Sequence, residues 1–396
     1  MPDSKPSSVL IIGGGFAGLR TALDLTRRAR PNLHITLVSD RPDFQYPPTL
    51  YRVVTGRDKR SSSVPLKELL KGRDIKIVTD TITAVDPAAH TATGKSGGSY
   101  SFDYLVLAIG SQPSYFHIEG LQELSYGFKT LDEALRLRKH LDEVLTLKPG
   151  EEKDEQVVSA NFMIVGGGPC GVELAGELGH YARSLAKKHK FDPSLITIDL
   201  IEAAPRVLPP MTPAVSAKVE AHLRDLGVNV FINKTVVKEE VEQLLLKDMS
   251  VKTKTVVWTA GVKPHALYSQ IAGLELDKRG KVVVDELLQA KGFPGIFILG
   301  DAASTQYAGL AQTALHDGNH AAQAILAHAS GSTPLPYAPA KPASAIPVGD
   351  GWAVTVYMGM TFYGRMGWWL RRAADLRFFF TIMSPALAIS TFRRDR

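Results

Sequence analysis

Two glycine-rich motifs in this sequence have the residue types and the spacing that bind the phosphates of a dinucleotide. Each motif follows a short apolar run and leads into a stretch with helical periodicity. The glycines are Gly13, Gly15 and Gly18 in the first motif, and Gly166, Gly168 and Gly171 in the second. The first glycine allows a sharp turn, the second lets backbone approach a pyrophosphate, and the third allows close packing of helix on strand. A single copy also fits a tight turn before an ordinary helix, but two copies in the same context predict two dinucleotide sites.

The helix that follows each motif contributes to the predicted sites. In the first motif this helix begins at Phe16 and Ala17, and we expect it to run to about Arg30. The phosphates would lie on the unpaired backbone N–H groups at the start of the helix. In the second motif, Glu173 lies in the first helical turn, where a carboxylate also suits the helix dipole without any catalytic role.

A carboxylate is expected after the strand that follows each motif, where it would bind a ribose hydroxyl. In the first unit, Asp40 lies 22 residues after Gly18 and is the predicted ligand, with Ser39 as a weaker alternative directly after the strand. In the second unit, Glu202 lies 31 residues after the last glycine of the motif. A carboxylate there favours NADH, because the 2′-phosphate of NADPH would meet a like charge, while Arg206 keeps NADPH open as an alternative.

Three further apolar runs end in small or acidic residues, as buried parallel strands do when their ends approach a ligand. We predict cofactor contacts at these ends, namely at Ala108 and Gly110, at Ala260 and Gly261, and at Gly300 and Asp301. The run that includes residues 256–261 is expected to return the chain to the first domain. Residues 44–51 combine aromatic residues with prolines, which predicts either an ordered loop against a flat ring or a plain surface loop.

A predicted helix over residues 311–327 carries Gln312, His316 and His320 on one face, because these residues are four positions apart. No second pair of ligands accompanies them, so we predict no metal site and side chains that are satisfied or exposed. The single cysteine, Cys170, lies inside the second glycine motif. One chain can therefore form neither a disulfide nor a C-x-x-C redox pair.

These elements predict an α/β fold with two Rossmann-like dinucleotide-binding domains and a C-terminal amphipathic segment. We expect the first domain over residues 1–120, the second over 121–256, and the remainder of the first over 257–329. Residues 330–396 would form a linker, rich in proline, alanine and serine, and the C-terminal segment.

Positive charge is concentrated near the C-terminus. The net charge is +6, and residues 365–396 contain seven arginines, two aspartates and the adjacent pair Trp368 and Trp369. Such an aromatic and cationic stretch is typical of a segment that lies on an anionic membrane surface, although a docked cap or a dimer interface would hide the same aromatic residues. A nucleic-acid-binding protein would carry basic charge on its folded domains, so we expect no nucleic-acid partner.

No apolar window in the sequence reaches the length that spans a bilayer, and no secretory signal is evident. We therefore expect a cytoplasmic protein attached peripherally to the inner face of the cell membrane, or to an organellar inner membrane. A homodimer is the default expectation for its assembly.

The motifs occur in the order typical of flavoprotein oxidoreductases with two dinucleotide-binding domains. The sequence most closely resembles the type II NADH:quinone oxidoreductases, with the apoptosis-inducing-factor-like quinone reductases as near neighbours. The matching segments are residues 11–19, 50–56, 102–111, 164–178, 257–262 and 296–303. In two places the sequence departs from the family: His316 replaces the second glutamine of an Ala-Gln-x-Ala-x-Gln motif, and Ser39 replaces the acid that usually follows the second strand.

The resemblance implies that FAD is held by the first motif and Asp301, that NADH is held by the second motif and Glu202, and that Glu173 lies near the nicotinamide. It also implies hydride transfer from NADH to the flavin and delivery of two electrons to a membrane quinone, without proton pumping. Gln312 and His316 are candidates to hydrogen-bond a quinone carbonyl, and His316 could deliver a proton because histidine titrates near neutral pH. A soluble NAD(P)H reductase for a ferredoxin-type protein and an NADH-sensing flavoprotein are the alternatives.

Overall fold

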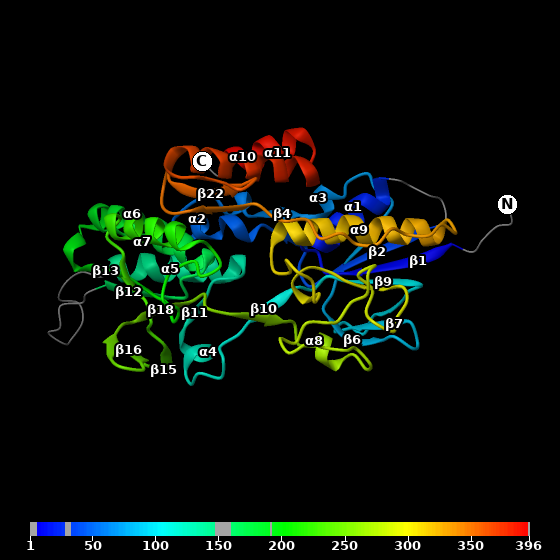
Figure 1. Ribbon diagram of the computed structural model, residues 1–396, viewed down its shortest axis with the longest axis horizontal. Helices are drawn as coiled ribbons and strands as arrows, with labels where there is room; N and C mark the ends of the chain where they lie inside the picture. Colours follow the sequence, from blue (N-terminus) through cyan, green and yellow to red (C-terminus); the bar gives the residue numbers. More distant parts are fainter. Residues whose placement is uncertain (1–5, 28–32, 147–159, 191, 395–396) are drawn as a thin grey trace.

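The computed structural model describes residues 6–27, 33–146, 160–190 and 192–394 (Figure 1). Within these residues, two parallel sheets of five strands each form the centres of two α/β units. In the order of their pairing, the strands of the first sheet are β20 (Ile296–Ile298), β9 (Tyr104–Leu107), β1 (Ser7–Ile12), β2 (Leu33–Ser39) and β5 (Lys76–Thr79). Those of the second sheet are β11 (Tyr126–Gly127), β18 (Thr255–Trp258), β12 (Ala160–Val165), β13 (Ile196–Ile201) and β14 (Asn229–Phe231).

The two units repeat one topology. In each, the central strand leads through a glycine motif into a long helix, which is α1 (Phe16–Arg27) in the first unit and α6 (Pro169–His189) in the second. Each unit also inserts a three-stranded antiparallel sheet directly before the strand that is second in the pairing order, which is β9 in the first unit and β18 in the second. These inserts comprise β6 (Ile82–Asp86), β7 (Thr91–Gly94) and β8 (Ser99–Ser101), and β15 (Val236–Glu240), β16 (Gln243–Leu246) and β17 (Ser250–Lys252). The predicted α/β fold with two Rossmann-like units is therefore confirmed.

Helices cover the sheets, which explains the continuous apolar runs of the strands. The last four residues of β1 and all of β18 are buried, as expected for parallel strands that are covered on both faces. The helices α1 and α9 (Ala311–Ala329) lie side by side in the core of the first unit, and α5 (Leu131–Thr146), α6 and α7 (Pro213–Asp225) pack around the second (Figure 1). The predicted end of the first helix at Arg30 lies outside the described residues.

A capping box begins α5. The Glu133 N–H donates to the Thr130 hydroxyl at 3.2 Å, and Glu133 Oε2 accepts the Thr130 N–H at 2.8 Å. Two backbone donors that the helix cannot satisfy internally are thereby paired.

Short elements connect the layers and join the units. They are β3 (Asp43–Gln45), α2 (Leu50–Val54), β4 (Ser63–Pro65), α3 (Leu66–Leu69), β10 (Ser111–Pro113), α4 (Leu121–Leu124), β19 (Val262–Pro264) and α8 (Leu267–Gln270). The strands β10 and β19 pair antiparallel, with Gln112 opposite Lys263, where the chain passes between the two units.

The run over residues 256–261 does not return the chain to the first unit, so that prediction is wrong. Its strand, β18, pairs in parallel with β12 and β11 at the centre of the second sheet. The predicted boundary between residues 256 and 257 therefore falls inside β18, and the chain crosses back at β19. A fully buried apolar strand fits the centre of either sheet, so its sequence does not reveal its partners.

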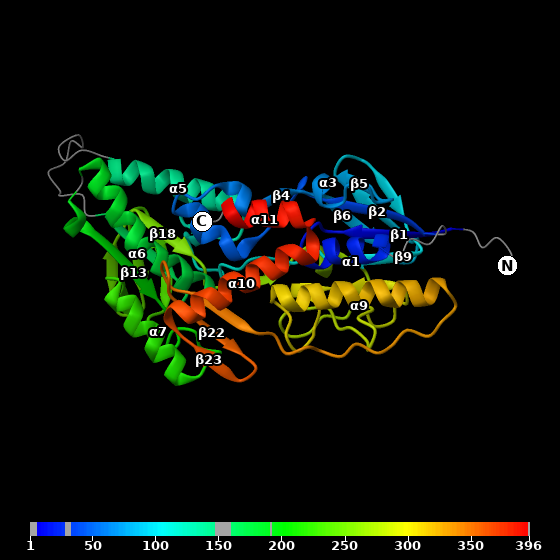
Figure 2. The same cartoon turned by 90° about the horizontal axis from the view of Figure 1, so that it is seen from above.

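The C-terminal segment lies across both units (Figure 2). It comprises β21 (Ser344–Pro347), β22 (Ala353–Tyr357), β23 (Met360–Phe362), α10 (Gly364–Ile382) and α11 (Pro385–Arg394). Ile346 and Val354 belong to the core of the second unit, whereas Phe379 and Ile382 belong to the core of the first. The segment therefore bridges the two units through separate apolar contacts.

Candidate functional site

The predicted FAD-binding residues come together at one edge of the first sheet. Ile12 pairs with Val38 and with Leu107, and Leu107 pairs with Ile298, so the ends of these four strands are aligned. The last residue of β2 and the turns that follow the four strands supply Gly13, Gly15, Ser39, Ala108, Gly110, Gly300 and Asp301. This carboxyl edge is where open α/β sheets bind their ligands.

The predicted NADH-binding residues are brought together in the same way. Val165 pairs with Ile201 and with Trp258 in the second sheet. The turns that follow these three strands carry Gly166, Gly168, Glu202, Ala260 and Gly261.

Each glycine of the first motif has its own steric environment. Gly13 has a left-handed backbone with φ of +110°, and a Cβ there would lie 2.4 Å from the Ala108 carbonyl oxygen. A Cβ on Gly18 would lie 1.9 Å from the Gly13 carbonyl oxygen, so only glycine allows this helix to pack so close to the turn. By contrast, no atom lies within 4 Å of a Cβ built on Gly15.

The second motif repeats this arrangement. Gly166 has φ of +116° and packs against Ala260, and a Cβ on Gly171 would lie 1.9 Å from the Gly166 carbonyl oxygen. Gly168 is open, with no atom within 4 Å of a Cβ. The open space over the middle glycine of each motif is what a pyrophosphate needs, so both turns fit a dinucleotide.

Two helix N-termini converge beside Asp301. A Cβ built on the preceding residue, Gly300, would lie 3.6 Å from the Ala314 Cβ and 4.0 Å from the Ala17 Cβ. Ala314 belongs to the first turn of α9, and Ala17 to the first turn of α1. The unpaired N–H groups and the positive dipole ends of both helices favour an anionic group at this place.

The carboxylate of Asp301 has two neighbours that the sequence analysis missed. Ser111 donates its hydroxyl to Asp301 Oδ2, and Lys129 Nζ donates to the Ser111 hydroxyl at 2.6 Å and lies 3.9 Å from Asp301 Oδ2. Burial lowers the pKa of Lys129, and the charge of Asp301 opposes that shift. Lys129 directly precedes the cap of α5, and nothing in its spacing indicates contact with the first unit.

Ser39, and not Asp40, occupies the position in the first unit that Glu202 occupies in the second. The residue before each, Val38 or Ile201, accepts a 2.8 Å hydrogen bond from the first glycine of its motif. Ser39 is buried, whereas Asp40 is exposed and forms an ion pair with Arg41. Ser39 is therefore the structural counterpart of Glu202, and the charge of Asp40 is engaged at the surface by Arg41.

Glu202 is held firmly beside the second glycine motif. Its Oε2 accepts the Gly167 N–H at 2.6 Å, and its Oε1 accepts the Ala204 N–H at 2.7 Å. Arg206, the alternative ligand for a 2′-phosphate, instead donates to the Pro209 carbonyl oxygen at 2.8 Å. The second unit thus presents a fixed carboxylate at this position.

Glu173 lies where α6 meets the C-terminal segment. Burial raises the pKa of Glu173 to about 8, the charges of Arg371 and Arg52 oppose the shift, and that of Asp375 adds to it. A carboxyl with this pKa is largely protonated at neutral pH and can give or take a proton there. No sequence pattern indicates that the C-terminal segment lies close to Glu173.

Residues 44–51 do not form a plain surface loop. They form the end of β3, a 3₁₀ turn over Pro47–Thr49 and the start of α2. The Tyr46 ring is buried and stacks on the Phe378 ring of α10, with centroids 4.7 Å apart. The interpretation as a plain surface loop is wrong, because the aromatic residues of this segment pack against a helix more than 300 positions away in the chain.

Two of the C-terminal arginines are buried. Arg371 forms an ion pair with Asp375 and donates to the Pro48 carbonyl oxygen at 3.1 Å, and Arg372 packs over the Phe392 ring. Their charges are therefore not available to a membrane surface. Of the seven arginines counted in the sequence, Arg396 lies outside the described residues.

The other face of α10 is exposed. It carries Met366, Trp369, Ala373, Arg377 and Phe380, spaced three or four positions apart. α10 thus both docks on the protein and leaves an apolar and cationic face uncovered. Among the described residues, no helix combines the length and the hydropathy that crossing a bilayer requires.

Gln312 and His316 contact the linker rather than the strand ends. The Gln312 side chain exchanges hydrogen bonds with the backbone of Ala343, at 3.0 and 3.1 Å, and His316 Nε2 lies 2.8 Å from the Ala338 carbonyl oxygen. His320 packs against the Tyr337 ring. Among the described residues, no cluster of three His, Cys, Asp or Glu side chains could hold a metal ion.

Residues 7–318 match the family described as pyridine nucleotide-disulphide oxidoreductase. The chain is 32% identical over 335 residues to the type II NADH:quinone oxidoreductase NdhA of Mycobacterium tuberculosis, an alignment that covers 80% of this chain and 71% of that protein. It is 25% identical to the type II NADH:quinone oxidoreductase of Staphylococcus haemolyticus, with 96% of this chain and 97% of that protein covered.

Solved structures share the fold. The structure of NDH2 from Plasmodium falciparum in complex with NADH has a TM-score of 0.88, with 17% identity, 99% of this chain and 97% of that chain covered. The sulfide:quinone oxidoreductase of Aquifex aeolicus has a TM-score of 0.80, with 21% identity, 95% of this chain and 91% of that chain covered. By sequence, motif and fold, the chain belongs to the type II NADH:quinone oxidoreductases, flavin-dependent members of the pyridine nucleotide-disulphide oxidoreductase family.

Proposed function

We propose that this chain oxidises NADH and reduces a membrane quinone, with FAD bound in the first unit and NADH in the second. The observation that carries the proposal is the pair of glycine turns, each with an open middle glycine, at equivalent edges of two sheets of equal topology. When bound, FAD accepts a hydride from NADH and passes two electrons to a quinone, which takes up two protons and becomes a quinol.

The residues of the chain bind and orient the reactants in this proposal. Asp301 and the N-termini of α1 and α9 hold the flavin dinucleotide, and the buried Ser39 is the preferred ribose ligand of the first unit. Glu202 binds a ribose hydroxyl of NADH and disfavours NADPH. The carboxyl of Glu173, protonated near neutral pH, holds a proton close to the C-terminal segment.

Gln312 and His316 remain candidates for the quinone site, although their side chains are engaged by the linker in this structure. Binding of a quinone carbonyl would require the linker to release them. The C-terminal segment packs close to Glu173. A quinone that approaches from a membrane would reach Glu173 equally directly along this segment.

Attachment to the inner face of the cell membrane, or of an organellar inner membrane, is part of the proposal. The exposed face of α10, with Trp369 and Phe380 beside Arg377, supports contact with anionic lipid. A homodimer is the proposed assembly, and sedimentation of the purified protein in detergent distinguishes it from a monomer.

Anaerobic stopped-flow mixing tests the central proposal. NADH should bleach the flavin absorbance rapidly, and a short-chain quinone added next should restore it equally fast. A flavin that NADH reduces but that only a ferredoxin-type protein reoxidises would favour the soluble reductase. A reduced complex that persists in the presence of quinone would favour an NADH sensor. Protein that neither carries nor takes up FAD would rule out all three.

A further inference from the structure

The linker between α9 and the C-terminal segment runs back along α9, where Gln312 and His316 contact its backbone and where its Tyr337 side chain packs inward. We call residues 332–343 the strap; they have no regular secondary structure and lie beside α9 (Figure 2). Within residues 331–340, only Pro334 and Tyr337 are not exposed. Tyr337 packs between the rings of His316 and His320, and its N–H donates to the Glu286 carbonyl oxygen at 2.6 Å.

The Tyr337 hydroxyl reaches a buried acid. It donates to Asp317 Oδ1 at 2.6 Å, and Asp317 is fully buried in α9. The other oxygen, Asp317 Oδ2, accepts the backbone N–H of Gly300 at 3.0 Å. A buried carboxylate requires hydrogen-bond donors for its oxygens. The strap supplies the donor to Asp317 Oδ1, and Gly300 supplies the donor to Asp317 Oδ2.

Gly300 is the residue through which this contact reaches the cofactor site. It has a left-handed backbone, with φ of +71°, and it directly precedes Asp301 between the N-termini of α1 and α9. Its N–H is buried at the end of β20 and would be unsatisfied without Asp317. A change in the Asp317 carboxylate therefore acts on the orientation of the Gly300–Asp301 turn.

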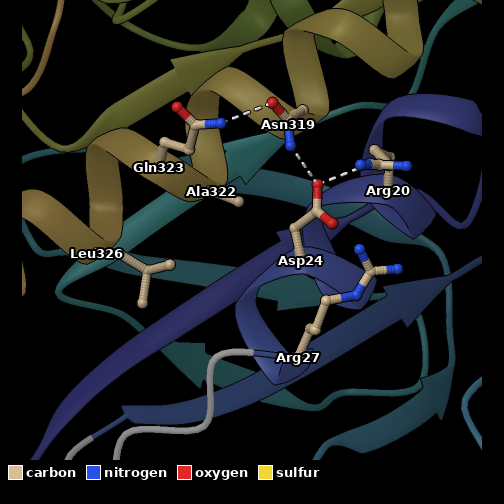
Figure 3. A pocket seen from close by; sticks show the side chains of 7 residues that line it. All are labelled: Arg20, Asp24, Arg27, Asn319, Ala322, Gln323 and Leu326. Atoms are coloured by element: carbon tan, nitrogen blue, oxygen red, sulfur yellow. Dashed lines mark hydrogen bonds and ion pairs between the residues drawn. The ribbon is translucent and has the colours of Figure 1, made fainter.

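The helix that carries Asp317 is fixed on its other side. Asp24 Oδ2 of α1 accepts hydrogen bonds from Arg20 Nε at 2.6 Å and from Asn319 Nδ2 at 2.7 Å (Figure 3). The pocket of about 160 Å³ in Figure 3 lies between the two helices, and α9 is held to α1 beside it. A Cβ on Gly318 would lie 2.4 Å from the Ala17 carbonyl oxygen, so the helices also touch through backbone. With α9 held in this way, loss of the Tyr337 contact acts on the Asp317 side chain rather than on the position of the helix.

We propose that Tyr337 and Asp317 are a pair of positioning residues through which the strap holds the Gly300–Asp301 turn in the geometry that binds FAD. The strap is thereby a determinant of flavin affinity as well as a connection between two parts of the chain. This inference rests on the proposed flavin site at Asp301. It assigns to the strap a role separate from any contact with lipid or quinone.

The test is the affinity of the apoprotein for FAD, measured by titration of flavin fluorescence. Tyr337→Phe removes only the hydroxyl and should weaken FAD binding about tenfold, because it removes a charge-assisted hydrogen bond. Tyr357→Phe makes the same chemical change at an exposed position on the β22–β23 hairpin and should leave the affinity unchanged. The visible circular dichroism of the bound flavin should change in the first variant and not in the second.

The conservative variant Asp317→Asn tests the mechanism. A neutral amide needs the phenol proton less than a carboxylate does, so adding Tyr337→Phe to Asp317→Asn should weaken FAD binding by much less than tenfold. If Tyr337→Phe lowers the melting temperatures of apoprotein and flavin-loaded protein equally and leaves FAD affinity unchanged, the pair is merely structural and the inference is overturned.

The variant Asp301→Ala tests the proposed flavin site independently of the role of the strap. If that variant binds FAD as tightly as the unaltered protein does, the proposed flavin site itself is wrong. If Asp301→Ala weakens FAD binding while Tyr337→Phe does not, the flavin site stands and only the role of the strap is overturned.

Discussion

The Tyr46 hydroxyl donates a 2.6 Å hydrogen bond to Asp375 Oδ1, which joins the first unit to α10 across 329 positions of sequence. Both residues are buried, and Asp375 also forms an ion pair with Arg371. Burial and the neighbouring carboxylate raise the pKa of Tyr46, so the phenol remains a donor at all ordinary pH values. The contact fixes α10 against the aromatic residues that follow β2.

Tyr46→Phe should loosen the C-terminal segment. The change removes one of the two donors to Asp375 Oδ1 and leaves only Arg371, and the loss of a hydrogen bond to this buried carboxylate costs about 1–3 kcal/mol of stability. Urea unfolding should reveal this loss, and limited proteolysis should cleave the C-terminal helices faster than in the unaltered protein. The matched control is Tyr357→Phe, whose hydroxyl is exposed. Equal proteolysis of the two variants would mean that the contact does not hold the segment.

The variants Gly15→Ala and Gly168→Ala should each impair only one of the two dinucleotide sites. Neither added methyl group meets an atom of the protein, so both variants should fold. Each methyl group occupies the space proposed for a pyrophosphate, so Gly15→Ala should lower the flavin content. Gly168→Ala should retain flavin and raise the KM for NADH about tenfold or more. The measurements are the flavin-to-protein ratio and steady-state kinetics, and loss of flavin in Gly168→Ala would contradict the assignment.

Glu202→Ala should relax the preference for NADH over NADPH. The carboxylate is held by the N–H groups of Gly167 and Ala204, so it stays where a 2′-phosphate would meet its charge. Its removal should lower kcat/KM for NADH about tenfold and raise that for NADPH. The ratio of the two kcat/KM values is the measurement. Asp40→Ala is the comparison in the first unit, and this exposed residue should leave the ratio unchanged.

Glu173 should make the stability of the flavin-loaded protein depend on pH. Its pKa is raised from 4.5 in an unperturbed carboxyl to about 8 in the fold, so the folded protein binds the proton more tightly than the unfolded chain does. The resulting stabilisation is complete below about pH 4.5 and is lost as the pH rises to about 8. Glu173→Gln should flatten the pH dependence of the free energy of unfolding over this interval. An unchanged slope would assign the dependence to other groups.

Trp369→Ser should weaken membrane attachment without affecting the reaction of the soluble enzyme. The Trp369 side chain is 63% exposed on α10, and its loss should reduce binding to anionic lipid vesicles roughly tenfold. Co-sedimentation with vesicles measures the binding, and turnover with a water-soluble quinone provides the activity control. Val241→Ser alters an even more exposed apolar residue on the β15–β16 hairpin, on the opposite side of the molecule from α10 (Figure 1). This variant should sediment normally.

Local chemistry made much of the fold predictable. A Cβ on Gly18 would collide with the carbonyl oxygen of Gly13, which is only five positions earlier in the chain. Because such contacts join residues close in sequence, the glycines they require form a motif that can be recognised in the sequence. The capping box of Thr130 and Glu133 was predictable for the same reason. The parallel arrangement of strands followed from buried apolar runs that alternate with helices.

Contacts between residues far apart in sequence were decided only by the tertiary structure. The partners of β18, the hydrogen bond of Tyr46 to Asp375, and the approach of Lys129 to Asp301 leave no periodic signal, because each depends on how separate layers of the fold pack together. The sequence by itself determined the two dinucleotide-binding units, since turn, strand and helix are encoded within about thirty residues. Which arginines are buried, and which residues the strap and α10 contact, followed only from packing, because burial and pairing depend on neighbours that the chain brings together at the end of folding.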